Sequence, residues 1–222
     1  MENGLLQSEL FQGIPSEEYE SLRTRCTLLD CDKKEILFKE NDKAEAVWFI
    51  LSGWVRLVRK SPEGRPVTIF VMTPKEPICG VSALGCHVYT ATAIAATKVR
   101  IAKVPRDLFI ELLERYPFFA IRVIETCCKR IREMSFSYTI AYDTVDRRIA
   151  HVLLRLSGDF GNILPFTHKE ISEMGGTALE TSIRVLSKMK RKGWLMVRRG
   201  EISLLKPDEL AKSMERDKDF AR

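Results

Sequence analysis

Hydrophobic and polar positions alternate over short runs in the first half of the chain, and these runs are rich in β-branched and aromatic residues. Turn-forming residues such as Ser52-Gly53 and Ser61-Pro62-Glu63-Gly64 separate the runs. Several short strands at this spacing predict a jelly roll or barrel, which either fills with side chains or holds one small ligand. The strands are expected at 35–39, 47–51, 54–58, 67–71, 90–96 and 99–104.

A helical pattern follows over about 107–142, with Pro117 marking a break between two segments. Apolar positions in the second segment recur in alternating steps of three and four, the heptad pattern of a coiled-coil contact. Packing of the helix on its own barrel is the alternative. Both can hold, because Val123, Cys127 and Met134 form a second partial stripe. The heptad pattern predicts a homodimer interface formed by Ile121, Ile124, Cys128, Ile131, Ser135, Tyr138 and Tyr142.

The segment 167–194 has the pattern of a helix-turn-helix. Thr167 and Glu170 have the spacing of a capping box, which predicts the start of a helix. Gly175-Gly176 ends this helix after about two turns. The second helix has apolar residues at helical spacing: Leu179, Ile183, Leu186 and Met189. A short helix, a glycine turn and a second helix suit insertion into the DNA major groove.

Charge strengthens this interpretation. Glu180, Arg184 and Lys188 fall at i, i+4 and i+8 and so share one helix face. Such a face is often simply solvated, and many helical hairpins contain a glycine turn. The 181–200 stretch, however, holds seven Lys or Arg and no Asp or Glu. Residues 146–222 carry 16 basic and 11 acidic side chains, so they account for most of the net charge of +6. A polyanionic partner at this end explains the asymmetry.

The residues after the second helix predict a wing. Gly193-Trp194 ends the helix, 195–197 and 202–205 read as strands, and Arg198-Arg199-Gly200-Glu201 forms a tight turn between them. Arginines at the tip of a hairpin are placed to contact phosphates. The predicted DNA contacts are Thr167, Thr177, Leu179, Glu180, Thr181, Arg184, Lys188, Arg198 and Arg199.

These elements together predict an α+β protein with a strand-rich jelly roll, a long helix and a winged helix-turn-helix, and length and composition are consistent with two modest domains. The domains are expected at 1–106, 107–144 and 145–222 of the 222 residues. No apolar run approaches the ~20 residues of a membrane span and no signal peptide opens the chain, which predicts a cytoplasmic protein without a membrane partner. Six cysteines need not form disulfides there. Neither a serine-histidine-acid set nor a phosphate loop appears, so an enzyme is not expected.

Three features together resemble the Crp/Fnr superfamily of bacterial transcription regulators: a β-roll with the Leu51-Ser52-Gly53 turn, a long dimer helix and the ETSIR helix at 180–184. The resemblance covers about Leu10 to Leu210, and its most specific parts are 44–58, 146–156 and 167–194. It implies an effector-binding β-roll, a dimerising helix, a winged DNA-binding domain and RNA polymerase as a partner. The alternative is a cyclic-nucleotide-type module that acts on a protein without touching DNA.

The resemblance places Glu180 and Arg184 at the base-reading positions of the family. Arg binds guanine O6 and N7 with two hydrogen bonds, and Glu accepts one from cytosine N4. Leu179 stands where cyclic-AMP receptor proteins have an arginine, and an apolar side chain there suits a thymine methyl. We therefore expect palindromic operators with half-sites nearer TTGA than TGTGA.

The effector-binding residues depart from the cyclic-nucleotide pattern of the family. Val81 stands where that pattern has a ribose-binding Glu, and Tyr89 where it has a phosphate-binding Arg. A buried phosphate without a cationic partner is costly, which argues against cyclic AMP. The expected effector pocket comprises Gly80, Val81, Ser82, Ala83, Leu84, Tyr89, Thr90 and Tyr138.

The sequence leaves the identity of a cofactor open. An iron–sulfur cluster fits poorly, because no cysteine precedes Cys26 and the neighbours Cys127 and Cys128 point about 100° apart on a helix. Cys26 and Cys31 are expected to be small buried residues. Haem stays open, with Cys79, Cys86 and His87 as ligand candidates, although a structural role is commoner for such residues.

The effector is therefore expected to be another small molecule or a gas. The N-terminal segment and the wing look most like the nitric-oxide and nitrosative-stress branches of the superfamily. His151, in a helix with apolar neighbours, is expected to be a hydrogen-bonded packing residue.

Overall fold

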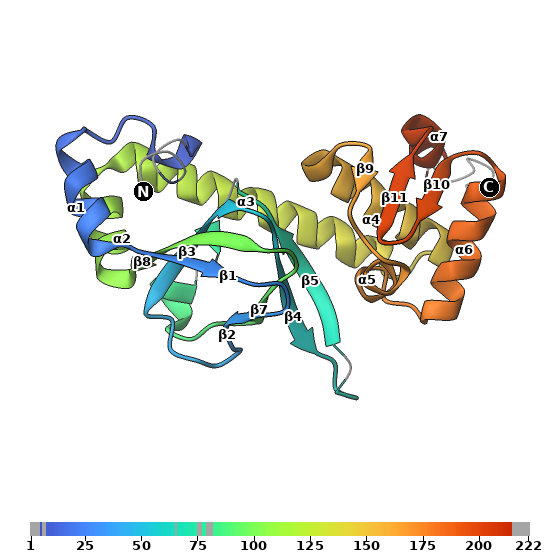
Figure 1. Ribbon diagram of the computed structural model, residues 1–222, viewed down its shortest axis with the longest axis horizontal. Helices are drawn as coiled ribbons and strands as arrows, with labels where there is room; N and C mark the ends of the chain where they lie inside the picture. Colours follow the sequence, from blue (N-terminus) through green and yellow to red (C-terminus); the bar gives the residue numbers. More distant parts are fainter. Residues whose placement is uncertain (1–4, 6–7, 65, 75–76, 79–81, 215–222) are drawn as a thin grey trace, which may run out of the picture. The chain divides into compact units, whose positions relative to one another are not determined.

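The computed structural model describes residues 5, 8–64, 66–74, 77–78 and 82–214. The chain divides into two compact units, Met1–Glu133 and Met134–Arg222, each of which has its own core (Figure 1). Among the described residues, no helix has both the length and the apolar character needed to cross a membrane.

The first unit is built on two four-stranded antiparallel sheets, in the orders β1-β8-β3-β6 and β2-β7-β4-β5. The six strands predicted from alternation are present, with ends shifted by up to two residues, and β1 and β6 complete the sheets. The strands are β1 (Thr27–Cys31), β2 (Ile36–Phe38), β3 (Ala46–Ser52), β4 (Val55–Lys60), β5 (Pro66–Met72), β6 (Pro77–Ile78), β7 (Thr92–Ala95) and β8 (Val99–Pro105).

The turn between β3 and β4 requires its glycine. Gly53 has a φ of +77°, and a Cβ there would lie 2.3 Å from the carbonyl oxygen of Lys98. The backbones of two chain segments approach each other at this point too closely for any side chain.

Helices cover one side of this β-roll. They are η1 (Glu9–Phe11), α1 (Glu17–Arg25), α2 (Arg106–Arg115) and the first turns of α3 (Pro117–Ile140). Four phenylalanines join these elements: the Phe11 ring lies 5.2 Å from both Phe49 and Phe119, and Phe109 lies 5.8 Å from Phe119. Because Phe49 belongs to β3, the aromatic cluster fixes the start of α3 on the sheet.

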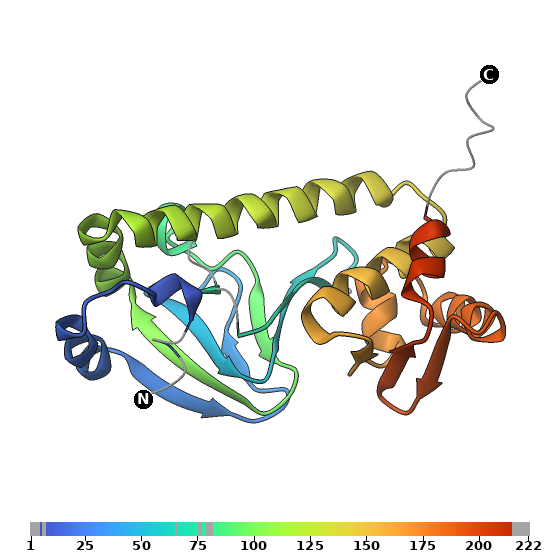
Figure 2. The ribbon, with the colours of Figure 1, turned by 90° about the horizontal axis from the view of Figure 1, so that it is seen from above.

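Helix α3 is continuous over 24 residues (Figure 2), and the predicted break before it lies at Pro117. Its Phe119 and Val123 are buried, whereas Ile121, Ile124 and Ile131 of the heptad stripe are 57%, 60% and 65% exposed. The predicted heptad stripe extends beyond the helix, because α3 ends at Ile140 and Tyr142 lies in the following turn. The hydroxyl of Tyr142 lies 3.2 Å from that of Tyr138, and Cys128 and Ser135 are exposed.

The second unit packs helices around a three-stranded sheet of order β10-β11-β9. Its elements are α4 (Val145–Phe160), β9 (Ile163–Leu164), α5 (His168–Met174), α6 (Leu179–Arg191), β10 (Leu195–Arg198), β11 (Glu201–Leu204) and α7 (Pro207–Lys212). The core includes Ile149 and Leu153 of α4, Ile171 of α5, Leu186 of α6 and Ile202 of β11, all fully buried. One hydrophobic core therefore fixes α5 and α6 against the sheet.

Candidate nucleic-acid interface

Helix α5 begins with the predicted capping box. The Thr167 hydroxyl accepts a hydrogen bond from the Glu170 N–H at 3.3 Å and donates one to Glu170 Oε2 at 2.9 Å. Glu170 Oε2 also accepts from the Thr167 N–H at 2.8 Å. The Thr167 hydroxyl is thus engaged in starting the helix, and its predicted DNA contact stays a prediction.

A glycine turn connects α5 to α6. Gly176 has a φ of +58°, the left-handed conformation that favours glycine. The Thr177 N–H donates to the Ser172 carbonyl at 3.1 Å, which ties the turn back to α5. The helix-turn-helix predicted over 167–194 is confirmed in both its helices and its turn.

The buried face of α6 includes only part of the predicted apolar pattern. Ser182, Val185, Leu186 and Met189 form it, at i, i+3, i+4 and i+7. Of the apolar residues predicted at helical spacing, Leu186 and Met189 are buried, whereas Leu179 and Ile183 are 37% and 42% exposed. The core of the unit selects one stripe of the helix, and the small Ser182 in that stripe is fully buried.

Glu180 and Arg184 lie on the opposite side of α6. Both side chains are exposed, and within the described part of the chain neither makes a hydrogen bond or an ion pair. Ser187 and Arg191 continue the same exposed face at helical spacing. An unpaired carboxylate and guanidinium on the second helix of the motif are free to bind base edges.

Lys188 is placed differently from the other two predicted reading residues. Its Nζ lies 2.5 Å from Oδ1 of Asp146, in the first turn of α4. The predicted alignment of Lys188 with Glu180 and Arg184 is therefore only partial, because its charge is directed toward α4.

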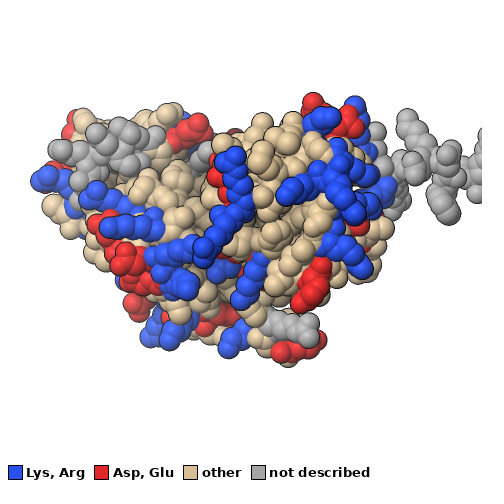
Figure 3. All heavy atoms as spheres, turned by 45° about the vertical axis from the view of Figure 1, so that its right-hand side comes forward, with Lys and Arg blue, Asp and Glu red and all other residues tan. Residues whose placement is uncertain are grey.

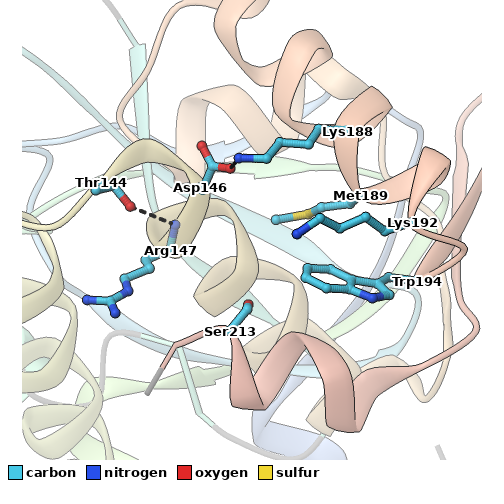
Figure 4. A pocket seen from close by; sticks show the side chains of 8 residues that line it. All are labelled: Thr144, Asp146, Arg147, Lys188, Met189, Lys192, Trp194 and Ser213. Atoms are coloured by element: carbon cyan, nitrogen blue, oxygen red, sulfur yellow. Dashed lines mark hydrogen bonds and ion pairs between the residues drawn. The ribbon is translucent and has the colours of Figure 1, made fainter. Parts of the chain in front are cut away.

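Two hollows adjoin this ion pair. One of about 340 Å³ is drawn in Figure 4, where Lys192 lies over the Trp194 ring, 4.3 Å from its centroid. Its lining is Thr144, Asp146, Arg147, Lys188, Met189, Lys192, Trp194 and Ser213. The other, of about 460 Å³, is lined by Val145, Asp146, Thr181, Arg184, Val185, Lys188 and Arg191. Figure 3 shows many Lys and Arg side chains on the face that it displays, with Asp and Glu side chains between them.

The wing is the hairpin of β10 and β11. Arg198 pairs with Glu201 across a two-residue turn, in which Gly200 has a φ of +74°. Arg198 and Arg199 are both exposed, as a phosphate contact requires. Strand β9, which no sequence pattern predicts, pairs with β11 and makes the wing part of a three-stranded sheet.

Tyr89 of the predicted effector pocket lies inside the β-roll and is 4% exposed. Its ring stacks on Phe38 with centroids 3.9 Å apart. Its hydroxyl donates to the Ala46 carbonyl at 3.0 Å and accepts from Trp48 Nε1 at 2.9 Å. The residue at the phosphate-binding position is therefore neutral and already hydrogen-bonded within the core.

The remaining effector residues are described only in part. Gly80, Val81 and the haem candidate Cys79 lie outside the described residues. Ser82 and Ala83 are buried in a π-helical turn, Ser82–Cys86, whereas Leu84, Cys86, His87 and Thr90 are exposed. Tyr138 belongs to the second unit, so its place in the pocket stays a prediction.

The chemistry around the pocket does not favour a bound phosphate. Residues 77–97 contain no Lys or Arg, so this segment supplies no fixed cation to a cyclic nucleotide. Haem ligation by Cys86 or His87 stays a prediction. The described residues contain no cluster of three or more His, Cys, Asp or Glu that could hold a metal ion.

Two other predictions about titratable residues have different outcomes. Cys26 and Cys31 are buried as predicted, and burial raises the pKa of the Cys26 thiol to about 11. His151 packs against Phe136 at 4.9 Å, but its Nε2 has no hydrogen-bond partner in the described structure, so the expected hydrogen bond was wrong at that atom. Burial, with the nearby charge of Arg155, lowers the pKa of His151 to about 4.

Two protein-family models match the chain: a cyclic nucleotide-binding domain over residues 28–116 and a Crp-like helix-turn-helix domain over 147–213. The CRP-like cAMP-activated global transcriptional regulator of Mycobacterium tuberculosis is 23% identical, with 96% of this chain and 99% of the relative covered. The nitrogen fixation regulation protein FixK of Bradyrhizobium diazoefficiens is 29% identical, covering 78% of this chain and 76% of the relative.

Solved structures share the fold. FixK2 from Bradyrhizobium japonicum superposes with a TM-score of 0.75 at 20% identity, covering 84% of this chain and 96% of that one. The c-di-GMP responsive global regulator CLP of Xanthomonas campestris has a TM-score of 0.72 at 16% identity, covering 86% of this chain and 99% of that one. The order of β-roll, long helix and helix-turn-helix unit thus occurs in solved proteins of this size.

Proposed function

Because the chain belongs to the Crp/Fnr family of transcription regulators, we propose that it is a homodimer that reads palindromic operators with α6. The observation that carries this function is the exposed pair Glu180 and Arg184, unpaired within the described chain, on the second helix of a helix-turn-helix whose opposite face is buried. The helices of the motif are held rigidly, and the reading side chains are left free.

Base recognition follows from the chemistry of that pair. The Arg184 guanidinium suits guanine O6 and N7, and the Glu180 carboxylate suits cytosine N4. Leu179 is exposed at the start of α6, where an apolar side chain fits a thymine methyl. TTGA-type half-sites contain both a thymine and a guanine for these contacts. Arg198 and Arg199 of the wing bind phosphates and position the helix.

Dimerisation uses the outer stripe of α3. Three isoleucines that are more than half exposed on one stripe of a helix are unusual for a monomer, and a second α3 would bury them. A two-fold axis along that stripe supplies two copies of α6, one for each half-site. Half-sites centred one helical turn apart, about 34–36 Å, match such a dimer.

The β-roll supplies the regulation. We infer an effector other than cyclic AMP, because Tyr89 is committed to Ala46 and Trp48 and residues 77–97 lack a cation. A small molecule or a gas, with haem as an optional cofactor, fits the expected pocket better. The protein acts by binding rather than by catalysis, in the cytoplasm, with RNA polymerase as its partner at promoters.

Replacement of Arg184 by Ala tests the reading role. Wild-type protein should lose about 1–3 kcal/mol of binding free energy when the guanine in each half-site is changed, and Arg184→Ala should remove that preference at one base pair. Lys190→Ala is the matched control, since it removes an exposed cation of the same helix away from the reading face. Fluorescence anisotropy with a panel of altered operators measures the binding free energies of the wild type and of both variants. Uniform weakening by Arg184→Ala over the whole panel would contradict base reading.

A further inference from the structure

Asp146 is the unexpected charge in the DNA-facing part of the second unit. It lies in the first turn of α4, two residues after the N-cap Thr144, and pairs with Lys188 of α6. Both side chains are about half exposed, and 42 residues of sequence separate them. Exposed ion pairs of this kind contribute little to stability, so the fold does not depend on the pair.

The surrounding charges show why the carboxylate is notable. The two hollows that adjoin the pair have only Asp146 and Lys188 in common. Their linings include five cationic side chains, and Asp146 is the single carboxylate among the lining residues. The cationic side chains are Arg147, Arg184, Lys188, Arg191 and Lys192.

The position of Lys188 makes this carboxylate relevant to DNA. Lys188 lies on α6 one turn after Arg184, and a lysine beside base-reading residues is of the type that contacts backbone phosphates. Figure 4 shows its ammonium group pointing to Asp146 and away from the Trp194 side of the hollow. The pair has no net charge, so its attraction for a phosphate is weaker than that of an unpaired lysine.

We propose that Asp146 withholds Lys188 from the DNA backbone and so limits the sequence-independent affinity of the protein. The proposal rests on the proposed DNA-binding function and adds a restraint to it. Phosphate contacts strengthen binding to any duplex equally. A cation neutralised on the reading helix therefore reduces retention on non-operator DNA without changing which bases are read.

The salt dependence of DNA binding tests this restraint in the full-length protein. Each phosphate neutralised by a released cation steepens the slope of log K against log salt by about 0.9. Asp146→Asn should therefore steepen the slope by about 0.9 per subunit, or about 1.8 per dimer. Affinity at low salt should rise by the same factor for an operator and a scrambled duplex, leaving their ratio unchanged.

Two further variants serve as controls. Glu209→Gln removes a carboxylate from an exposed ion pair of the same unit, with Lys212 at 3.0 Å, and should leave the slope nearly unchanged. The double variant Asp146→Asn with Lys188→Gln removes the whole pair and should return the slope to the wild-type value. Asp146→Ser keeps a residue that suits a helix start and repeats the test if Asp146→Asn folds poorly.

A carboxylate at the start of α4 also interacts favourably with the helix dipole, so Asp146 could act only by stabilising the helix. That role predicts a different result. If Asp146 acts only there, Asp146→Asn lowers the thermal unfolding midpoint and leaves the slope unchanged, which overturns the proposal. Weaker binding by Asp146→Asn would also overturn it, because Asp146 would then be positioning Lys188 on a phosphate. A wild-type protein with no salt-dependent duplex binding would defeat the proposed function itself.

Discussion

The reading helix α6 and the interior of the β-roll use polar side chains in opposite ways. On α6, Glu180 and Arg184 are exposed and make no hydrogen bond or ion pair within the described chain. Inside the β-roll, Trp48 Nε1 donates to the Tyr89 hydroxyl, which donates to the Ala46 carbonyl. Unpaired polar groups on the second helix of a helix-turn-helix are available to an external partner, whereas the polar groups of Tyr89 and Trp48 are used in packing. The second unit therefore shows more about its ligand than the first.

Helix α3 contains the same contrast within one element. Phe119 and Val123 face the core, whereas the isoleucine stripe is left exposed. An exposed apolar stripe on a long helix, like the unpaired polar pair on α6, indicates a partner outside the chain.

The largest expected effect comes from the exposed stripe. Ile131→Glu places a charge where two copies of α3 meet and should convert the dimer to a monomer. Operator affinity should then fall on the order of 10²–10⁴-fold, since the second half-site is no longer tethered. Sedimentation velocity and anisotropy measure the two effects, and Ile131→Leu is the control that should retain both. A dimeric Ile131→Glu protein would contradict the assigned stripe.

The next largest expected effect is a loss of stability on changing Tyr89 in the interior of the β-roll. Tyr89→Phe leaves the Trp48 N–H and the Ala46 carbonyl without their buried partner, which should cost about 1–3 kcal/mol of unfolding free energy. Denaturant unfolding measures this cost. Tyr142→Phe, at a residue 80% exposed, should stay within about 0.5 kcal/mol. Equal stability of the two variants would mean that the hydroxyl of Tyr89 is not part of the packing.

His151 of α4 is a partly buried titratable side chain of the second unit, and its Nε2 has no hydrogen-bond partner in the described structure. Its folded-state pKa of about 4 lies below the ordinary value of 6.5, so the unfolded chain binds the proton more tightly. Stability is therefore retained above pH 6.5 and falls as the pH decreases toward 4. Because the ring is partly exposed, the loss should be on the order of 1 kcal/mol. Unfolding curves from pH 4 to 7 for wild type and His151→Gln measure it. Parallel curves for the two proteins would show that His151 does not cause the loss.

Local signals explain which parts of the fold were predictable. The capping box at Thr167, the glycine turn and the two-residue turn of the wing are determined by neighbouring residues, and all three were placed correctly. The apolar spacing along α6 does not separate the buried Leu186 and Met189 from the exposed Leu179 and Ile183, because α4, α5 and the sheet decide which stripe is covered. The contact of Tyr89 with Trp48 joins residues 41 positions apart and leaves no local pattern.

Two further features could not be predicted from the sequence: the shortest strand of the second unit and the ligand of the effector pocket. Strand β9 has two residues, too few for any periodicity. In the effector pocket, the sequence shows which groups of the cyclic-nucleotide pattern are absent, and Tyr89 shows what occupies one of those positions. Neither observation names the molecule that binds there, because residues 77–97 contain no Lys or Arg in place of the missing groups and haem ligation by Cys79, Cys86 or His87 stays a prediction.

Operator reading by α6 can be tested by selecting duplexes from a randomised library with the purified full-length protein. We expect enrichment of an inverted repeat with TTGA-type half-sites about 10–10.5 base pairs apart, bound with a steep salt dependence. A pool that stays random through successive rounds, or one that retains a single unrepeated element, would contradict it.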